Sequence, residues 1–328
     1  MEQQRRNIGL DVIRGVSAIL IMLYHYTSRY IDLNAPVLGI TERKFNLSWG
    51  CYAVITFFFI SGYLSSRNVV VHTHPQTFLL KRFKRLYPTF WVAMLFTTCV
   101  LLISGYESVS LRDFLFNLTM TPMIFGAQPI DGVYWTQQYE LIFFFFIFVA
   151  LFFDKIKAIK VFSLIWLLFS VGFFFIQTQG DNIWIKFFRV FAIPNYCAVF
   201  IAGMQIRFFE INENRLLTVI TLMLCLAAFA IWQGTEQLFF FLLVIVAVTY
   251  VIFNKRSILN RYNWFTKFFA FIASISYPLY LIHQKVGYVI MNKIVTRLHL
   301  TTELIIVIPI VVSIAIAYLL HKLVECKI

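Results

Sequence analysis

The chain has 328 residues, of which 60% are hydrophobic and 13% are charged, and its mean hydropathy is +0.79. The charged share is about half of that in soluble proteins, so the composition excludes a soluble globular protein and predicts a protein that crosses a membrane many times. The formal net charge of +13 is typical of cations that flank membrane spans, and it is no argument for nucleic-acid binding.

Apolar segments of membrane-spanning length recur along the whole chain. They lie at residues 8–30, 49–66, 86–105, 133–153, 161–178, 185–206, 216–233, 237–253, 268–291 and 303–321. The predicted fold is an all-α integral membrane bundle of about ten transmembrane helices. Most loops are short and no repeat is clear, so we expect a single domain over residues 1–328 without an appended extracytoplasmic domain.

Lysine and arginine residues gather in alternate segments between these spans. Eighteen of the 28 fall in residues 1–7, 67–85, 154–160, 207–215, 254–267 and 322–328. By the positive-inside rule these segments are cytoplasmic, and both termini are therefore predicted on the cytoplasmic side. A cleaved signal peptide is not expected, because Asp11 and Arg14 interrupt the first apolar segment.

The first span carries two residues that are costly in a membrane, Arg14 and His25. Eleven positions along a helix return to nearly the same face, roughly 16 Å further on. Asp11 precedes Arg14 by one turn, so the two can form an ion pair. Ionisable groups inside spans tend to mark substrate or proton paths, although a packing ion pair and a hydrogen-bonded core histidine would leave the same pattern.

Four cations precede the third span, in the segment Lys81-Arg82-Phe83-Lys84-Arg85. Arg82 and Arg85 lie one helical turn apart, and guanidinium groups form forked bonds to phosphate oxygens. The segment is therefore a candidate site for a nucleotide phosphate. An anchor that contacts lipid head groups is the alternative.

Two further ionisable residues are embedded in later spans. Counting along the predicted spans places Glu140 and His283 in the outer half of the membrane, at a depth similar to that of His25. A neutral imidazole beside a carboxylate can take a proton from an attacking hydroxyl, as in acyl transfer. A proton relay in a transporter would use the same groups, so this chemistry leaves both classes open.

Metal chemistry has weak support in the sequence. The five cysteines are scattered without a CxxC pair, so neither a disulfide framework nor a metal site is expected. His72 and His74 flank Thr73 in a predicted inner loop and are a weak candidate for a metal.

Five short patterns occur in the order found in acyltransferase family 3, a group of membrane proteins that includes bacterial O-antigen and other surface-glycan O-acetyltransferases. They are Arg14 with His25, Phe57–Leu64, Arg82–Pro88, Trp135–Glu140 and Ile275–His283. They are distributed along the chain from Arg14 to His283, and the chain resembles this family over its whole length. Gln137 stands where leucine is usual, and Glu325 is followed by Cys-Lys-Ile where proline often follows.

The resemblance implies transfer of an acyl group, most often acetyl, from cytoplasmic acyl-CoA to a hydroxyl of an extracytoplasmic glycan or lipid-linked glycan, in the inner membrane of a bacterium. Under this hypothesis His25 is the general base or a transient acyl carrier, Glu140 orients it, and His283 lies near the acceptor. The CoA phosphates are expected at Arg14, Lys81, Arg82 and Arg85, and structural roles at Asp11, Ser61 and Tyr277. A transporter of glycans or metabolites, and an acyltransferase that acts on a secreted small molecule, are the alternatives.

Overall fold

The structure is a computed structural model that describes residues 7–33, 48–71, 73–153, 155–177, 180, 182–254, 263–298 and 304–327. Every regular element in these residues is a helix, and they contain no strand. The prediction of an all-α fold is therefore confirmed for this part of the chain. His72, one of the two histidines considered for a metal, lies outside the described residues.

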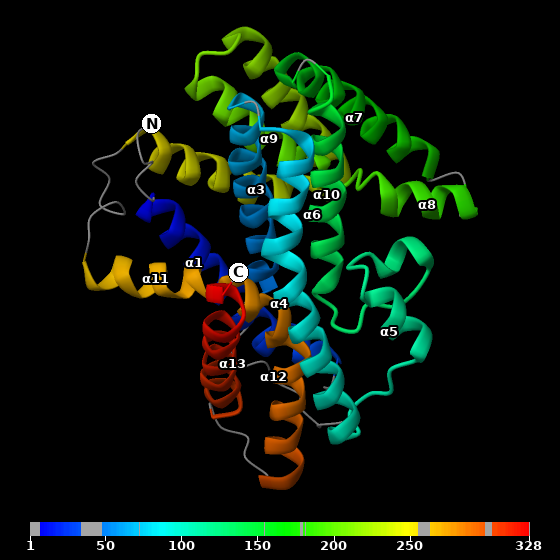
Figure 1. The fold of residues 1–328 in the computed structure, drawn as a ribbon, viewed down its shortest axis with the longest axis vertical. Coiled ribbons are helices and arrows are strands. Elements are labelled where there is room, and N and C mark those ends of the chain that lie inside the picture. Colours follow the sequence, from blue (N-terminus) through cyan, green and yellow to red (C-terminus); the bar gives the residue numbers. More distant parts are fainter. Residues whose placement is uncertain are drawn as a thin grey trace. The chain divides into compact units, whose positions relative to one another are not determined.

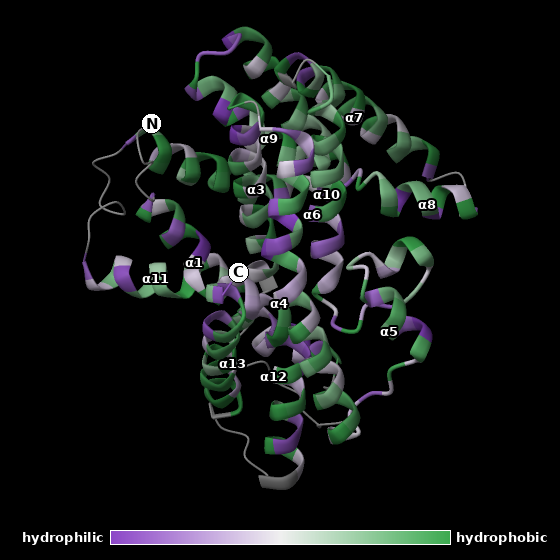
Figure 2. Cartoon of the chain, viewed as in Figure 1, coloured by the Kyte–Doolittle hydropathy of each residue, from purple (hydrophilic) through white to green (hydrophobic). Residues whose placement is uncertain are grey.

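The helices follow the apolar segments in chain order (Figure 1). They are α1 (Ile8–Tyr24), the π-helix η1 (His25–Arg29), η2 (Ser48–Tyr52), α3 (Ala53–Val70), α4 (Pro75–Ser104), α5 (Leu111–Asn117), η3 (Pro122–Phe125), α6 (Tyr134–Ala150), α7 (Lys155–Gln177), α8 (Ile183–Phe191), α9 (Cys197–Glu210), α10 (Arg215–Phe253), α11 (Trp264–Ser274), α12 (Ser276–Leu298), α13 (Leu304–Leu323) and η5 (Glu325–Lys327). Hydrophobic colouring prevails along most of the long helices (Figure 2).

Six helices among the described residues are long and apolar enough to cross a membrane, and a seventh span results if α11 and α12, bent by 71°, count as one. The protein is thus a multi-pass helical membrane protein. The number of ten spans and the cytoplasmic position of both termini stay predictions.

One predicted span is divided in the structure, and two others share a helix label. Residues 185–206 form two helices, α8 and α9, because Ile193 and Pro194 interrupt the helical run. The helical conformation is disfavoured for a residue that precedes proline, and Ile193 has a φ of 41°. The predicted spans 216–233 and 237–253 fall on the two halves of α10, which breaks between them at Gly234 with φ 81° and ψ 179°. Glycine adopts such a positive φ without steric cost.

The chain divides into two compact units, each assembled from separate segments. Unit 1 comprises Met1–Val54, Lys84–Thr136 and Arg256–Ile328, and unit 2 comprises Ile55–Phe83 and Gln137–Lys255. Helix α4 contributes to both. The two units are compact parts of the fold, and the single functional domain over residues 1–328 stays a prediction.

In unit 1, α1 packs against α11, and α12 packs against α13. In unit 2, α9 packs against α7 and α10, and α3 approaches α9 through two glycines. A Cβ atom on Gly62 would lie 2.1 Å from the Phe200 carbonyl oxygen, and one on Gly203 would lie 2.0 Å from that of Phe59. Small residues of this kind let helix backbones meet closely in membranes.

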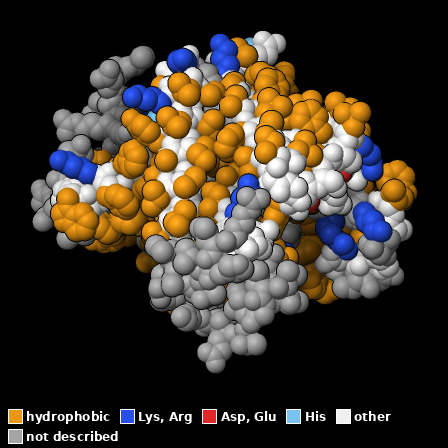
Figure 3. Space-filling view, turned by 90° about the horizontal axis from the view of Figure 1, so that it is seen from below, with side chains coloured by type: hydrophobic (Ala, Val, Ile, Leu, Met, Phe, Trp, Pro, Cys, Tyr) orange, Lys and Arg blue, Asp and Glu red, His pale blue; other side chains and the backbone are white. Residues whose placement is uncertain are grey.

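Large apolar side chains remain exposed on the long helices. Leu168 of α7 and Trp184 of α8 are each 68% exposed, and Val246 of α10 is 66% exposed. Hydrophobic side chains cover much of the described surface in Figure 3, with lysine and arginine at scattered positions. Lipid contact explains such a surface, since a soluble protein rarely exposes large apolar patches.

Candidate active site

The first span changes its helical form at His25. Helix α1 ends at Tyr24, and His25–Arg29 form a π-helical turn in which the Tyr30 N–H donates to the His25 carbonyl oxygen. π-helical turns are rare in proteins, and those that occur are often found at functional sites. The His25 side chain is buried, with 7% of the residue exposed.

The structure brings His25 and His283 into direct contact. The distance from His25 Nδ1 to His283 Nε2 is 2.7 Å, and the two rings stack with centroids 4.9 Å apart. His283 lies on α12 and is 1% exposed. The sequence places both histidines at a similar depth but does not predict that they bond to each other.

The contacts of His283 determine which nitrogens carry protons in the neutral pair. His283 Nδ1 lies 2.9 Å from the Tyr280 carbonyl oxygen and 3.1 Å from that of Leu279. Carbonyl oxygens only accept hydrogen bonds, so His283 Nδ1 must donate and His283 Nε2 must accept. His25 Nδ1 is then the donor, and its Nε2 carries the lone pair. No described residue of the same unit bonds to His25 Nε2, which leaves this atom available as a base.

Two residues that the sequence analysis missed hold the pair in place. The Tyr26 hydroxyl donates to the His283 carbonyl oxygen at 2.7 Å and lies 2.9 Å from Ser313 Oγ on α13. Tyr26 also packs against Gly287, where a Cβ atom would lie 2.3 Å from the tyrosine ring. The only signals in the sequence are the position of Tyr26 next to His25 and a serine in an apolar helix.

Arg14 and Asp11 form the predicted ion pair, with Arg14 Nη1 3.8 Å from Asp11 Oδ1. Arg14 Nη2 also donates to Ser276 Oγ at 3.2 Å, at the first residue of α12. Arg14 therefore connects α1 with the bend between α11 and α12. Its side chain keeps 23% of its surface exposed.

Tyr277 connects α12 to α4 within unit 1. Its hydroxyl donates to the Leu86 carbonyl oxygen at 2.9 Å, one residue beyond Arg85. The Arg85 side chain is exposed.

In unit 2, Ser61 and Glu140 bond to each other. The Ser61 hydroxyl on α3 donates to Glu140 Oε1 on α6 at 2.6 Å. The described contact of Glu140 is thus with a serine of its own unit, and its expected contact with His25 stays a prediction.

The cations of α4 differ in their surroundings. The Arg82 guanidinium lies over the Phe144 ring at 4.5 Å and over the Phe78 ring at 5.3 Å, and it donates to Ser65 Oγ at 3.3 Å. Lys81 and Arg85 are exposed. Arg82 is therefore held by aromatic faces, whereas Lys81 and Arg85 extend from the helix.

Metal ligands do not gather in the described part of the chain, where no group of three His, Cys, Asp or Glu residues could hold an ion. All five cysteines are described, and none of them forms a disulfide.

The fold and the buried histidine pair define a helical membrane protein with acid–base groups in its interior. The family described as acyltransferase domain, acyltransferase family 3, matches residues 7–322, and the chain belongs to it. The chain is thus a helical membrane protein of an acyltransferase family.

A similar curated protein is Nodulation protein 10 of Rhizobium leguminosarum bv. viciae. It is 25% identical over 156 aligned residues, which cover 42% of this chain and 42% of that protein. The matched part is thus less than half of that protein's length. No solved structure matches the chain.

Proposed function

We propose that the protein is an O-acyltransferase that moves an acetyl group from cytoplasmic acetyl-CoA to a hydroxyl of an extracytoplasmic glycan. The observation that carries this proposal is the His25–His283 pair, which leaves the lone pair of His25 Nε2 available. Membership of the acyltransferase family favours this function over that of a transporter. We place the protein in the inner membrane of a bacterium, with the glycan free or lipid-linked.

In the proposed reaction His25 is the general base. Its Nε2 takes the proton of the acceptor hydroxyl while the hydroxyl oxygen attacks the thioester carbonyl carbon. The bond from the carbonyl carbon to the CoA sulfur then breaks, and the leaving sulfur receives the proton from His25. The products are an acetyl ester and CoA with its thiol.

His283 orients the His25 ring in the proposed reaction. It accepts the hydrogen bond from His25 Nδ1–H and so fixes the ring that carries the base. When His25 is protonated, the bond from its Nδ1–H to the His283 lone pair becomes charge-assisted and stronger. This assignment differs from the expectation that His283 lies next to the acceptor.

The donor is proposed to bind through its phosphates at the cytoplasmic end. Arg85 and Lys81 offer exposed cations on α4, and Arg14 keeps part of its guanidinium exposed. Arg82, held against Phe144 and Phe78, presents a guanidinium with restricted motion, which lowers the entropy cost of forked bonds to phosphate.

The test compares surface glycans from a strain that lacks the gene after complementation with the wild type, His25→Ala or His321→Ala. His321 is a matched control because it lies at the end of α13 and contacts Glu325 instead of the pair. We expect acetyl esters with the wild type and His321→Ala, and none with His25→Ala, as measured by mass spectrometry. Full acetylation by a membrane-inserted His25→Ala protein would refute the role of His25.

A further inference from the structure

A short segment of unit 1, Asp131–Thr136, lies against the turn of α12 that carries His283. Asp131 Oδ2 accepts the backbone N–H of Lys285 at 3.0 Å. Thr136 Oγ1 bonds to the Tyr280 hydroxyl at 3.0 Å. The two contacts fall on either side of His283 along the helix, so the segment holds this turn from both ends.

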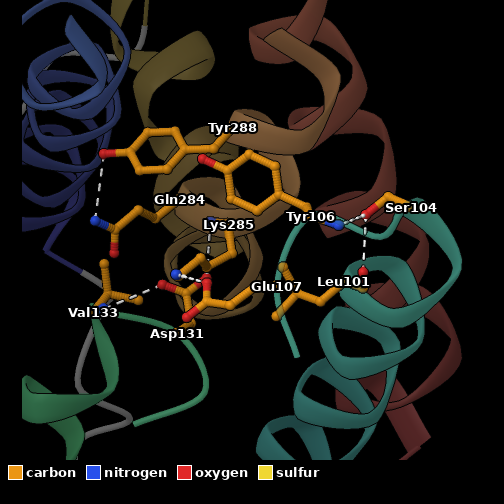
Figure 4. A network of polar contacts seen from close by, with 9 residues as sticks. All are labelled: Leu101, Ser104, Tyr106, Glu107, Asp131, Val133, Gln284, Lys285 and Tyr288. Carbon is orange, nitrogen blue, oxygen red and sulfur yellow. Dashed lines mark hydrogen bonds and ion pairs between the residues drawn. The ribbon is translucent and has the colours of Figure 1, made fainter. Parts of the chain in front are cut away.

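Gly132 brings the segment close to the helix between these contacts. A Cβ atom at this position would lie 2.6 Å from Gln284 Oε1. Any larger residue would push the segment away from α12 or displace the Gln284 amide. Gln284 also donates to the Tyr288 hydroxyl at 3.4 Å, one turn further along α12 (Figure 4).

Asp131 is fully buried, with 0% of the residue exposed. Its Oδ1 accepts the N–H of Val133 at 3.2 Å and its Oδ2 accepts that of Lys285, so both carboxylate oxygens bind backbone. Inside a helix an N–H ordinarily donates to the carbonyl four residues earlier. A carboxylate that reaches such an N–H therefore fixes the position of this turn.

The same turn determines the geometry of the histidine pair. The Tyr280 carbonyl oxygen accepts from His283 Nδ1 at 2.9 Å, and the Tyr280 hydroxyl is the group that Thr136 bonds. A small rotation of the turn would move His283 Nε2 away from its 2.7 Å contact with His25.

We propose that Asp131 is a positioning residue for the reaction: through the Lys285 N–H it holds His283 in the register that keeps the Nε2 atom of His25 unprotonated and oriented. This inference rests on the proposed function of the pair. Neither the sequence patterns nor the family match assigns a role to Asp131.

The ionised form of Asp131 is the one that accepts two hydrogen bonds. Burial raises the pKa of the Asp131 carboxyl to about 6, against the opposing effect of the N–H groups and of the Lys285 ammonium. The charged or titratable groups that face it are Lys285, Glu107, Tyr26, Tyr134 and Tyr288. Lys285 Nζ pairs with Glu107 beside the carboxylate (Figure 4).

The pH dependence of activity distinguishes a positioning role of Asp131 from a role in stability alone. Because the pKa in the folded protein lies above that of an exposed carboxyl, the stability contribution of Asp131 is present at low pH and is lost as the pH rises through about 6. Protonation of His25 removes the base at acid pH in the wild type and in Asp131→Asn alike, so the informative quantity is the difference between the two proteins. If Asp131 positions the pair as the carboxylate, the ratio of wild-type to Asp131→Asn activity should fall as the pH drops below about 6.

The experiment uses the purified full chain in lipid nanodiscs, with labelled acetyl-CoA and surface glycan from the strain that lacks the gene. Asp131→Asn is compared with Glu107→Gln, which also removes one negative charge from the network but makes no described bond to the α12 backbone. We expect kcat to fall about 10-fold to 100-fold in Asp131→Asn with the KM for acetyl-CoA and the thermal midpoint little changed. Glu107→Gln should keep kcat within about twofold, since its partner Lys285 stays partly in solvent.

A second measurement tests the positioning role of Asp131 independently of enzymatic activity. In protein labelled with ¹⁵N at histidine, the wild type should show His25 and His283 as single Nδ1–H tautomers, and Asp131→Asn should show a mixture. Wild-type kcat and tautomers in Asp131→Asn would overturn the inference, as would an equal loss of kcat in both variants. If the wild type transfers no acetyl group, the proposed function fails, and the tautomers still decide whether Asp131 positions the pair.

Discussion

The two compact units hold their embedded polar groups in different ways. In unit 1, His25 and His283 bond to each other, and backbone carbonyls complete the contacts of His283. In unit 2, Glu140 bonds to the Ser61 hydroxyl. The histidine pair is thus oriented by a second imidazole and the backbone of its own unit, so it needs no carboxylate partner to fix its tautomer.

Replacing each proposed partner of His25 tests this contrast most strongly. Because His283 accepts the bond from His25 Nδ1–H, we expect His283→Gln to lower kcat about 10-fold to 100-fold, within the range of acid–base effects. Glu140→Gln keeps an acceptor for Ser61, and we expect a smaller loss. The measurement is kcat for transfer from acetyl-CoA to surface glycan. A larger loss in Glu140→Gln than in His283→Gln would make Glu140 the orienting group.

Close helix packing in unit 2 offers a test that is independent of the chemistry. A Cβ atom on Gly203 would meet the Phe59 carbonyl oxygen at 2.0 Å, whereas one on Gly172 meets no atom within 4 Å. Overpacking in a tight interface costs about 1–3 kcal/mol, so Gly203→Ala should lower the thermal midpoint by several degrees. Gly172→Ala should leave it unchanged or raise it, because alanine favours a helix over glycine. Equal midpoints in the two variants would contradict the close contact between α3 and α9.

Substitution of an exposed cation on α4 should affect donor binding alone. Arg85 is exposed, so Arg85→Ala should keep the stability within about 0.5 kcal/mol. If its guanidinium binds a CoA phosphate, the KM for acetyl-CoA should rise about 10-fold with kcat little changed. Lys322→Ala, at the cytoplasmic end predicted for α13, is the control for general charge. An unchanged KM in Arg85→Ala would exclude the phosphate contact.

The sequence predicts contacts between residues that lie within one helical turn of each other. It does not predict contacts between residues that are far apart in the chain. The Asp11–Arg14 pair follows from a spacing of three residues, and the all-α membrane fold follows from composition. The bond between His25 and His283 joins residues 258 positions apart, so counting along spans gives a shared depth but no contact.

Asp131, Tyr26 and Ser313 were missed for the same reason. Asp131 is in a predicted outer loop, where a carboxylate is ordinarily solvated, and only the chain path buries it against α12. Tyr26 and Ser313 read as common residues of apolar helices. By contrast, the break between α8 and α9 had a visible signal in Pro194, which hydropathy alone overlooks.

Acceptor-dependent release of CoA tests the central claim most directly. Purified wild type, His25→Ala and His321→Ala are mixed with labelled acetyl-CoA and glycan from the strain that lacks the gene, and both free CoA and labelled glycan are measured. We expect wild type and His321→Ala to release CoA and label the glycan in equal amounts, and only when the glycan is present. His25→Ala should be slower by about 100-fold or more, in line with the loss of a general base. Equal rates in His25→Ala and the wild type would contradict the account.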